Sequence, residues 1–434
     1  ASQQASSGAA LARQWMRRAL LASLISSTAG MAASKPPIVI AGAGLHGSAL
    51  AYYLTKRGEK PILVERHAVA AAASGKGGGF LARDWGEGSV TNQLHQVGFA
   101  LHEELASELD LTSYRRIPVL SISPGQKSAR TRTDLCPDWL DGDFEQARMM
   151  DADGGAQVAP LELCTKLADA AVANGATLRI GTVQGIRTRP SAAGASGVAS
   201  SESDPLEEVC GVVVDGEEIE CSAFVVTMGP WACLAQDWFD MPVPMTGIKS
   251  TSVVFRASEG VQVDPVALFC GEDDRFGTHL EVYPRSSGEI YLCGIGGSEY
   301  VSDDQLRAGA YPPGQVHADP SRVSAAAASF STMSKKLGKP DPDTVQACMR
   351  PCPPDALPLM GKIPHIRGAY MSAGHNCWGI LWSPVSGKAM SELILDGQAS
   401  CVDLAAFAPG RFMAKANKGT RGRRKGAAAV GEQW

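Results

Sequence analysis

The feature that most constrains the fold of this chain is a glycine-rich turn between an apolar run and a helical segment. The chain there reads IVIAGAGLHG, in which Gly42, Gly44 and Gly47 form a G-x-G-x-x-G motif directly after a β-branched run. In this motif the first glycine permits a tight turn, the second lets a pyrophosphate approach the backbone, and the third lets a helix pack against a strand. The free N–H groups at the start of that helix, near Leu45 and His46, favour negative charge. The motif therefore predicts a dinucleotide-binding site.

The segments after the turn complete the start of a β-α-β unit. A helix is predicted from about Leu45 to Arg57, followed by an apolar strand at Pro61–Val64. Glu65 closes this strand, 21 residues after Gly44 and next to Arg66. A carboxylate at this position accepts hydrogen bonds from a ribose. An acid here disfavours NADP, but it does not separate NAD from FAD.

Composition limits the class of protein. The 434 residues exceed what one hydrophobic core usually holds, so a second lobe is expected. The 47 glycines suit an α/β protein with many tight turns, and the net charge of −5 gives no reason to expect a nucleic-acid partner. The 11 cysteines are scattered without a C-x-x-C pair, which argues against a disulfide scaffold and against a zinc site. No metal is expected.

Apolar periodicity predicts the remaining elements. Helices are expected at 91–109, 160–173, 319–338 and 386–395. Strands are expected at 177–180, 209–214, 221–228, 252–255, 280–283, 290–293 and 369–372. The stretch 190–205 is dominated by Ser, Ala and Gly, so it is expected to be a surface insertion in a hairpin. The run of strands after residue 252 predicts a separate antiparallel lobe.

Four segments outside the turn carry a second signature. They are Ala73–Leu81 (ASGKGGGFL), Phe224–Trp231 (FVVTMGPW), Cys348–Gly361 (CMRPCPPDALPLMG) and Ser372–Ile380 (SAGHNCWGI). Within the third, the pattern R-P-x-x-x-D-x-x-P-x-x-G is present. These segments resemble the D-amino-acid oxidase superfamily, which includes glycine oxidase and sarcosine oxidase, and they look closest to eukaryotic members of unassigned substrate. The resemblance implies FAD as cofactor, with an NAD dehydrogenase as the alternative.

The same resemblance implies where FAD would bind. In the family, the glycine-rich second segment runs beside the pyrophosphate and the flavin ring, and the Gly-His…Gly turn offers backbone N–H groups to the flavin. Val183 matches the position whose backbone meets the adenine. The implied FAD contacts are Gly42, Gly44, Leu45, His46, Gly47, Glu65, Arg66, Ser74, Gly75, Lys76, Gly77, Gly78, Gly79, Val183, Thr227, Gly229, Trp231, Cys348, Gly374, His375, Asn376, Trp378, Gly379 and Ile380.

The expected chemistry is hydride transfer from the carbon that bears an amine to flavin N5. The lone pair of the neutral amine assists this transfer, so the protein needs to orient and desolvate rather than supply a strong base. Arg350 is the leading substrate contact, because a guanidinium binds a carboxylate through two parallel hydrogen bonds. An ion pair with Asp355 is the alternative role. Tyr283 is expected on a strand that faces the active site in relatives, or else in ordinary packing.

Further candidates each have a structural alternative. Lys76 would place positive charge near the flavin, or else is a solvated lysine. His375 would carry a proton, or else bonds the backbone. Lys249 and His279 are weaker candidates. Cys348 matches the strand position through which sarcosine oxidases attach FAD covalently, and a buried structural cysteine is the alternative.

The predicted architecture is α/β. A Rossmann-type FAD-binding domain is built from residues 36–110, 151–240 and 341–398, and an inserted antiparallel-sheet substrate domain from 111–150 and 241–340. The predicted activity is FAD-dependent oxidation of a small amine or amino acid with oxygen as acceptor. Two alternatives stay open: a dehydrogenase that passes electrons to a carrier protein or quinone, and a flavin-stabilised scaffold that binds other proteins.

Both ends of the chain differ from its body. Residues 1–35 are basic and rich in Ser and Ala, and no acid precedes Glu59. This composition is typical of a plastid or mitochondrial transit segment, while arginines before an apolar run also resemble a twin-arginine export signal. A disordered extension on a cytoplasmic protein is the alternative. The apolar run at 19–25 is too short to span a membrane. Residues 411–434 are expected to be a basic, disordered tail.

Overall fold

A computed structural model describes residues 35–128, 131, 134–192, 205–312 and 315–413. The fold is that of the compact unit beginning at Pro37. The targeting-like segment and nearly all of the basic tail lie outside the described residues, so both stay predictions. No described helix is long and apolar enough to cross a lipid bilayer.

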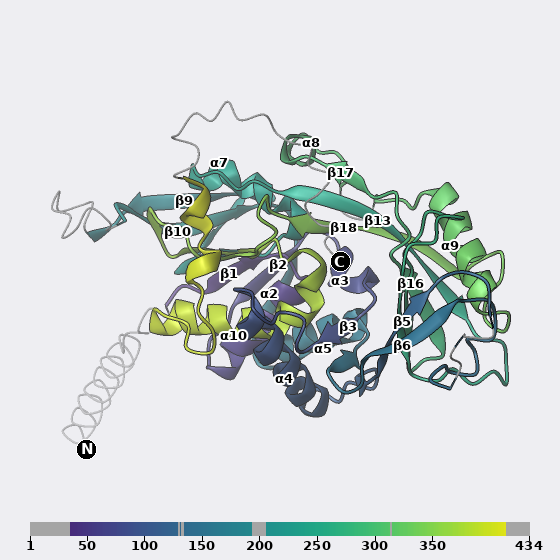
Figure 1. The fold of residues 1–434 in the computed structure, drawn as a ribbon. Helices are drawn as coiled ribbons and strands as arrows, with labels where there is room; N and C mark the ends of the chain where they lie inside the picture. The colour runs from purple at the N-terminus through teal and green to yellow at the C-terminus, as the bar shows by residue number, and fades with distance from the viewer. Residues whose placement is uncertain (1–34, 129–130, 132–133, 193–204, 313–314, 414–434) are drawn as a thin grey trace, which may run out of the picture. The chain divides into compact units, whose positions relative to one another are not determined.

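A six-stranded sheet lies at the centre of the dinucleotide fold (Figure 1). All neighbouring strands are parallel except β19, which is antiparallel to β21. Every residue of the two middle strands is buried, as expected for parallel strands covered on both faces. The strand order is β19 (Leu359–Lys362), β21 (Ala369–Ala373), β12 (Ala223–Val226), β1 (Ile38–Ala41), β2 (Ile62–Glu65) and β8 (Thr177–Ile180).

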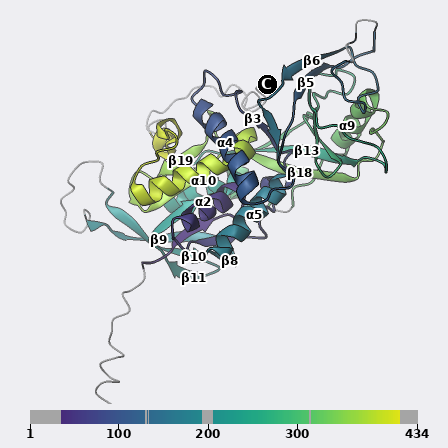
Figure 2. The ribbon, with the colours of Figure 1, turned by 90° about the horizontal axis from the view of Figure 1, so that it is seen from below.

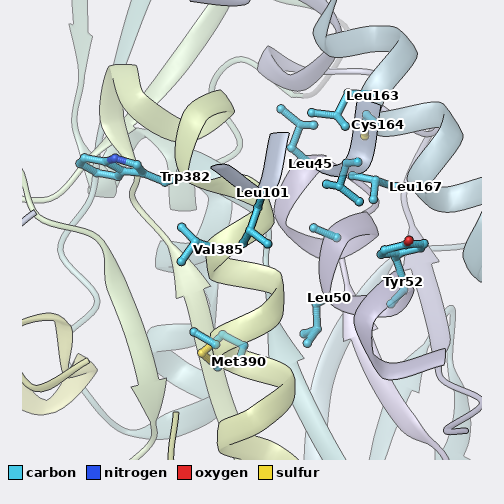
Figure 3. Close-up of a cluster of buried hydrophobic side chains, with 14 of the residues drawn as sticks. Leu45, Leu50, Tyr52, Leu101, Leu163, Cys164, Leu167, Trp382, Val385 and Met390 are labelled. Carbon is cyan, nitrogen blue, oxygen red and sulfur yellow. The ribbon is translucent and has the colours of Figure 1, made fainter. Parts of the chain in front are cut away.

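Four helices cover one face of this sheet and pack against one another (Figure 2). They are α2 (Leu45–Lys56), α4 (Asn92–Glu108), α5 (Pro160–Ala173) and α10 (Gly379–Asp396). Figure 3 shows their shared apolar core, in which Leu50 of α2 lies on the side of Met390 of α10 and Tyr52 of α2 on the side of Leu167 of α5. Alternate residues of β1 point into this core, which is why the strand reads as a continuous apolar run.

The opposite face of the central sheet is covered by a smaller sheet and a short helical stretch, whose apolar side chains form a second core. The smaller sheet contains β9 (Val183–Pro190), β10 (Glu207–Val214), β11 (Glu217–Glu220) and β20 (Ile366–Arg367). The helical stretch contains η1 (Gly229–Ala235) and α7 (Gln236–Phe239).

An eight-stranded sheet forms the second part of the fold. One of its faces packs against α9 (Pro320–Met333) and the other faces the cavity described below. Apart from the parallel pair β5 and β14, its pairs are antiparallel. The strands are β17 (Glu299–Val301), β13 (Thr246–Arg256), β16 (Glu289–Cys293), β15 (Glu281–Pro284), β14 (Ala267–Cys270), β5 (Val119–Ser123) and β6 (Gln146–Asp151), with β18 (Thr344–Cys352) on the free edge of β13.

Short elements connect these layers. A three-stranded sheet joins β3 (Phe80–Ala82), β7 (Gly155–Gln157) and β4 (Arg115–Arg116). The remaining helices are α3 (Ala73–Lys76), α8 (Asp303–Arg307), η2 (Asn376–Trp378), η3 (Ala405–Phe407) and η4 (Pro409–Phe412).

The predicted fold class is confirmed, and most predicted elements are present within two residues of their expected ends. Three differ. The strand expected at 252–255 is the second half of the longer β13, and the helix expected at 319–338 ends at Met333. The segment 341–398 is predicted as part of the FAD-binding domain; its first strand, β18, pairs with β13 of the eight-stranded sheet over nine successive residues. Of the predicted insertion at 190–205, residues 193–204 lie outside the described part.

Helix α10 begins seven residues before its predicted start, because Pro384 does not end it. Proline lacks the N–H group that would bond the carbonyl oxygen of Ile380. That oxygen instead accepts hydrogen bonds from Nε2 of His102 (3.0 Å) and from Oγ of Ser383 (2.9 Å). A histidine from another helix therefore replaces the missing backbone donor, which no local pattern in the sequence could indicate.

Candidate functional site

A large cavity lies where the carboxyl ends of the central parallel strands meet the eight-stranded sheet. Its wall includes the residues at or just beyond the ends of β1, β2, β8 and β12. Ligands of open α/β sheets bind at this edge. The described residues thus place one continuous cavity over the predicted nucleotide site and the antiparallel sheet.

Each of the three motif glycines is required for a different steric reason. Gly42 has φ of +105°, a conformation that side chains with a Cβ rarely adopt. A Cβ at Gly44 would lie 2.9 Å from Oγ of Ser74, which accepts a hydrogen bond from the N–H of Leu45. A Cβ at Gly47 would lie 1.9 Å from the carbonyl oxygen of Gly42. Gly42, Gly44 and Leu45 line the cavity, whereas Gly47 supports the turn from behind.

The acid predicted to bind the ribose is on the cavity wall. Glu65 lies at the end of β2 and lines the cavity together with Arg66 and Val183. One carboxylate oxygen accepts from the N–H of Ala43 (2.8 Å) and the other from the N–H of His67 (3.0 Å). These bonds fix the carboxylate, and its remaining lone pairs can accept from hydroxyl groups.

The turn after β12 completes this end of the cavity. Thr227, Gly229 and Trp231 all line the wall. The hydroxyl of Thr227 donates to the carbonyl oxygens of Ala41 (2.8 Å) and Gly42 (2.9 Å), so it ties the turn to the glycine motif. Gly229 has φ of +54°.

The glycine-rich segment after β2 also lines the cavity. A Cβ at Gly77 would lie 2.7 Å from Cδ1 of Ile380, and one at Gly78 would lie 2.5 Å from the ring of Tyr283. The absence of side chains therefore lets α10 and β15 approach this backbone. Gly79 lines the wall as well.

Predicted cofactor contacts divide into two groups. Those on the cavity wall are Gly42, Gly44, Leu45, His46, Glu65, Arg66, Ser74, Gly77, Gly78, Gly79, Val183, Thr227, Gly229, Trp231, Cys348, His375, Asn376, Trp378, Gly379 and Ile380. Those off the wall are Gly47, Gly75, Lys76 and Gly374.

Lys76 does not present its ammonium to the cavity, contrary to the role expected for it. Its Nζ donates to the carbonyl oxygen of Ala347 on β18 (3.1 Å), while its own carbonyl oxygen accepts from Nε2 of Gln346 (2.8 Å). Lys76 therefore holds α3 against β18. Lys249 does not line the cavity either, and its Nζ forms an ion pair with Glu299 (2.7 Å).

Two histidines stack at the start of α2. The ring centroids of His46 and His375 are 3.6 Å apart with an interplanar angle of 18°. Burial lowers the pKa of His46 to about 3 and that of His375 well below its ordinary value, so both rings are neutral at physiological pH. Nε2 of His375 lies 3.1 Å from Oγ of Ser386. This contact and the low pKa favour a structural role for His375 over proton transfer.

Unpartnered polar atoms mark this part of the wall. Nε2 of His46, Nδ1 of His375 and Oδ1 of Asn376 are buried without a hydrogen-bond partner. Buried polar atoms normally have partners, so three such atoms on one cavity wall fit a bound polar group. Together with the glycine cradle, they fit FAD, held by the motif glycines and Glu65 at one end and by the His375–Ile380 turn at the other.

Aromatic rings from the eight-stranded sheet, from β3 and from the segments near Trp85 and Trp378 gather on the cavity wall. Tyr283 stacks on Phe80 with centroids 5.4 Å apart, and Trp85 contacts both Phe269 (4.9 Å) and Trp378 (6.0 Å). Of these, only Tyr283 and Trp378 were predicted site residues. Phe80 stands within the quoted segment Ala73–Leu81 but was not singled out, and Phe269 comes from β14, far away in the sequence.

Charged groups on this wall are few. Arg350 of β18 and Glu281 of β15 line it, and His279 lies nearby on the wall. Asp355, the alternative partner predicted for Arg350, forms an ion pair with Arg411, whose Nε lies 2.9 Å from Oδ2. Glu281 was not predicted, since a single acid in a strand carries no spacing signal.

Cys348 lies on the wall two residues before Arg350. Burial raises the pKa of its thiol, which the charges of Arg350 and Lys76 partly offset. The described residues contain no group of three or more His, Cys, Asp or Glu side chains arranged to hold a metal ion.

The fold and the cavity define a dinucleotide-binding α/β enzyme with a second, antiparallel-sheet wall at its ligand site. The chain belongs to the DAO family, described as FAD dependent oxidoreductase, whose model matches residues 37–393. FAD is therefore its cofactor, and the predicted resemblance is confirmed.

Individual relatives agree with this assignment. The chain is 26% identical over 401 residues to an oxidoreductase of Schizosaccharomyces pombe, covering 85% of this chain and 96% of that protein. Glycine oxidase from Geobacillus kaustophilus has a similar structure, with a TM-score of 0.69 and 20% identity over 87% of this chain and 99% of its own. L-proline dehydrogenase from P. horikoshii gives a TM-score of 0.67 and 17% identity, covering 88% and 98%. At these identities the two structures show a shared fold.

Proposed function

We propose that this protein oxidises a small amino acid at the carbon that bears the amine, with FAD as the oxidant. The observation that carries the proposal is Arg350, a guanidinium on the wall of the same cavity as the predicted flavin turn. A guanidinium in such a wall recognises a carboxylate by two parallel hydrogen bonds. The names of glycine oxidase and L-proline dehydrogenase, which share the fold, support the same substrate class.

The residues of the chain have three tasks in this reaction. Arg350 binds the carboxylate and so fixes which carbon faces the flavin. The rings of Tyr283, Phe269 and Trp85 exclude water from the bound substrate. Bound FAD supplies the two-electron oxidation itself, as hydride acceptor.

Oxygen is the proposed electron acceptor, with a carrier protein or quinone as the alternative. The ammonium of Lys76 is bound to β18 rather than directed into the cavity, so it does not decide between them. The two acceptors are distinguished by the rate at which dioxygen reoxidises the substrate-reduced protein. Reoxidation faster than turnover supports an oxidase, whereas slow reoxidation supports a dehydrogenase.

The function is tested with purified protein and the variant Arg350→Lys. The wild-type protein is expected to show flavin absorption near ~375 and ~450 nm, which a small amino acid bleaches under anaerobic conditions. Lysine keeps the charge but loses the paired hydrogen bonds, so KM should rise about 10- to 100-fold with an unchanged flavin content. Absence of bleaching by every amino acid and amine in a broad panel contradicts the proposal and favours a flavin-stabilised scaffold.

The mode of FAD attachment is tested in the same preparation. Covalent attachment through Cys348 requires its thiolate, which burial disfavours. We therefore expect acid precipitation to release the yellow colour into the supernatant. Colour retained in the wild-type pellet but lost from a Cys348→Ser pellet would instead establish the covalent bond.

A further inference from the structure

We propose that Glu281 binds the protonated amine of the substrate, so that the cavity takes its amino acid as a zwitterion between Glu281 and Arg350. The inference rests on the proposed function and extends it, because it names a second charged contact and the ionic form of the substrate. It concerns a residue that no sequence motif marks.

Strand alternation places Glu281 on the cavity. In β15, Glu281 and Tyr283 line the wall, whereas Val282 between them is buried in the apolar core on the other face. The neighbouring strand follows the same rule, with Tyr291 and Cys293 on the wall. Glu281 pairs directly with Cys293 across the two strands.

Two neighbours hold the carboxylate in a fixed position. The hydroxyl of Tyr283 donates to Oε2 of Glu281, and Sγ of Cys293 lies 3.2 Å from the same oxygen. Burial raises the pKa of both Tyr283 and Cys293 well above their ordinary values, and the charge of Glu281 adds to this effect. Both groups therefore keep their protons and act as donors. Because they meet at Oε2, the lone pairs of Oε1 remain available to a cation in the cavity.

The fields of Glu281 and Arg350 overlap on this wall. The Cys293 thiol, bonded to Glu281, also feels the positive charge of Arg350. At Cys377, on the turn beside the predicted flavin site, Arg350 lowers the thiol pKa and Glu281 raises it, although burial dominates and brings it to about 12. A wall with one fixed positive and one fixed negative charge is complementary to a ligand that carries both.

Glu281 can also remove the proton from the substrate ammonium, which must be lost before hydride transfer. The amine must be neutral when its carbon is oxidised, whereas an amino acid in water at neutral pH carries an ammonium group. The N–H bond of the ammonium breaks, the proton passes to Oε1 of Glu281, and the electron pair stays on nitrogen. Glu281 would thus first bind the ammonium and then accept its proton.

The test uses three probes of nearly equal shape that have no hydrogen on the reacting carbon and so cannot be oxidised. Pivalate carries only a carboxylate, tert-butylammonium only an amine, and 2-aminoisobutyrate both. Their dissociation constants for the FAD-loaded protein are measured by calorimetry and by the shift of the flavin spectrum. Wild-type protein should bind 2-aminoisobutyrate most tightly.

The variant Glu281→Gln should act in opposite directions on the two singly charged probes. Affinity for tert-butylammonium should fall about 10- to 100-fold, whereas affinity for pivalate should stay the same or increase, because a like charge has been removed. Glu281→Asp, which keeps the charge, should retain the wild-type order of the three probes. Glu299→Gln on the same sheet, off the cavity wall, is the matched control and should change none of the constants.

A role for Glu281 in packing alone predicts a different result. Loss of the Tyr283 and Cys293 hydrogen bonds would weaken all probes in the same direction, and that outcome overturns the inference. Failure of the wild-type protein to bind tert-butylammonium or 2-aminoisobutyrate overturns it as well. These measurements require no turnover, so opposite shifts in a protein that oxidises no amino acid would support the Glu281 site while contradicting the proposed function.

The pH dependence gives a second readout in protein that does turn over. In Glu281→Gln, only the free amine from solution can react, so kcat/KM should rise about tenfold per pH unit up to the pKa of the substrate amine. In the wild-type protein the rise should be much shallower near neutral pH. Parallel pH profiles for the two proteins would exclude Glu281 as proton acceptor.

Discussion

Gly47 is the motif glycine with the least space around it. An added Cβ would lie 1.9 Å from the carbonyl oxygen of Gly42 and 2.7 Å from Oγ1 of Thr227. Neither the backbone nor the anchored threonine can yield without opening the turn, so Gly47→Ala should cost on the order of 1–3 kcal/mol of folding free energy. We expect purified Gly47→Ala to contain little or no FAD, measured as absorbance per chain.

Gly185 provides the control for this substitution. It lies in β9, and a Cβ there would have no atom within 4 Å. Gly185→Ala should therefore retain the wild-type flavin content. Full FAD occupancy in Gly47→Ala would show that the turn can adjust, contrary to the steric argument.

Site residues that belong to sequence motifs could be predicted from the sequence, and those outside motifs could not. Gly42, Gly44 and Arg350 are found because fixed spacing identifies them. Glu281 and Trp85 reach the cavity only through strand register and long-range packing. Such residues become visible only when strands distant in sequence have been paired.

Helix α10 shows the same limit at the scale of an element, since its start depends on His102 from α4. Nε2 of His102 must donate, because its partner is a carbonyl oxygen. Burial lowers the pKa of this histidine to about 4, compared with 6.5 for the exposed side chain. Between these pH values the unfolded chain binds a proton that the folded protein excludes, so stability decreases as pH falls through this window.

The variant His102→Gln isolates this effect. Glutamine can donate to the same carbonyl but does not titrate, so the variant should lose less stability on acidification. The difference in slope between pH 6 and pH 4.5 should approach about 1.4 kcal/mol per pH unit. Urea unfolding of both proteins across this range provides the measurement. Identical slopes would mean that His102 is protonated in the folded protein.

Strand β18 is the element whose placement matters most for function. Its sequence lies among segments of the nucleotide-binding part, yet it pairs with β13 from Thr246↔Cys352 to Val254↔Thr344. This pairing carries Cys348 and Arg350 from the nucleotide-binding part of the sequence to the substrate wall. Periodicity predicted only the second half of β13 and did not predict β18, and the partner of a strand is a nonlocal property that periodicity does not contain.

On the scale of the described residues, the cavity is built from nearly the whole length of the chain. Its wall begins at Ala41 and ends at Ile380, and it includes both the central parallel sheet and the eight-stranded sheet. A ligand that contacts both parts only when both are folded must stabilise both together. The sequence predicted a dinucleotide fold and an antiparallel sheet. That both line one cavity depends on the tertiary fold.

FAD should therefore act as a folding ligand for both parts. At a free concentration about 100 times its dissociation constant, it should add about 2.7 kcal/mol to the free energy of unfolding and raise the unfolding temperature accordingly. Hydrogen exchange with and without FAD locates that gain. We expect slower exchange in α2, next to the glycine motif, in β15, which carries Glu281 and Tyr283, and in the neighbouring strand β16. Protection confined to α2 would mean that the eight-stranded sheet folds independently of the cofactor, and substrate-side variants such as Glu281→Gln should then leave FAD affinity unchanged.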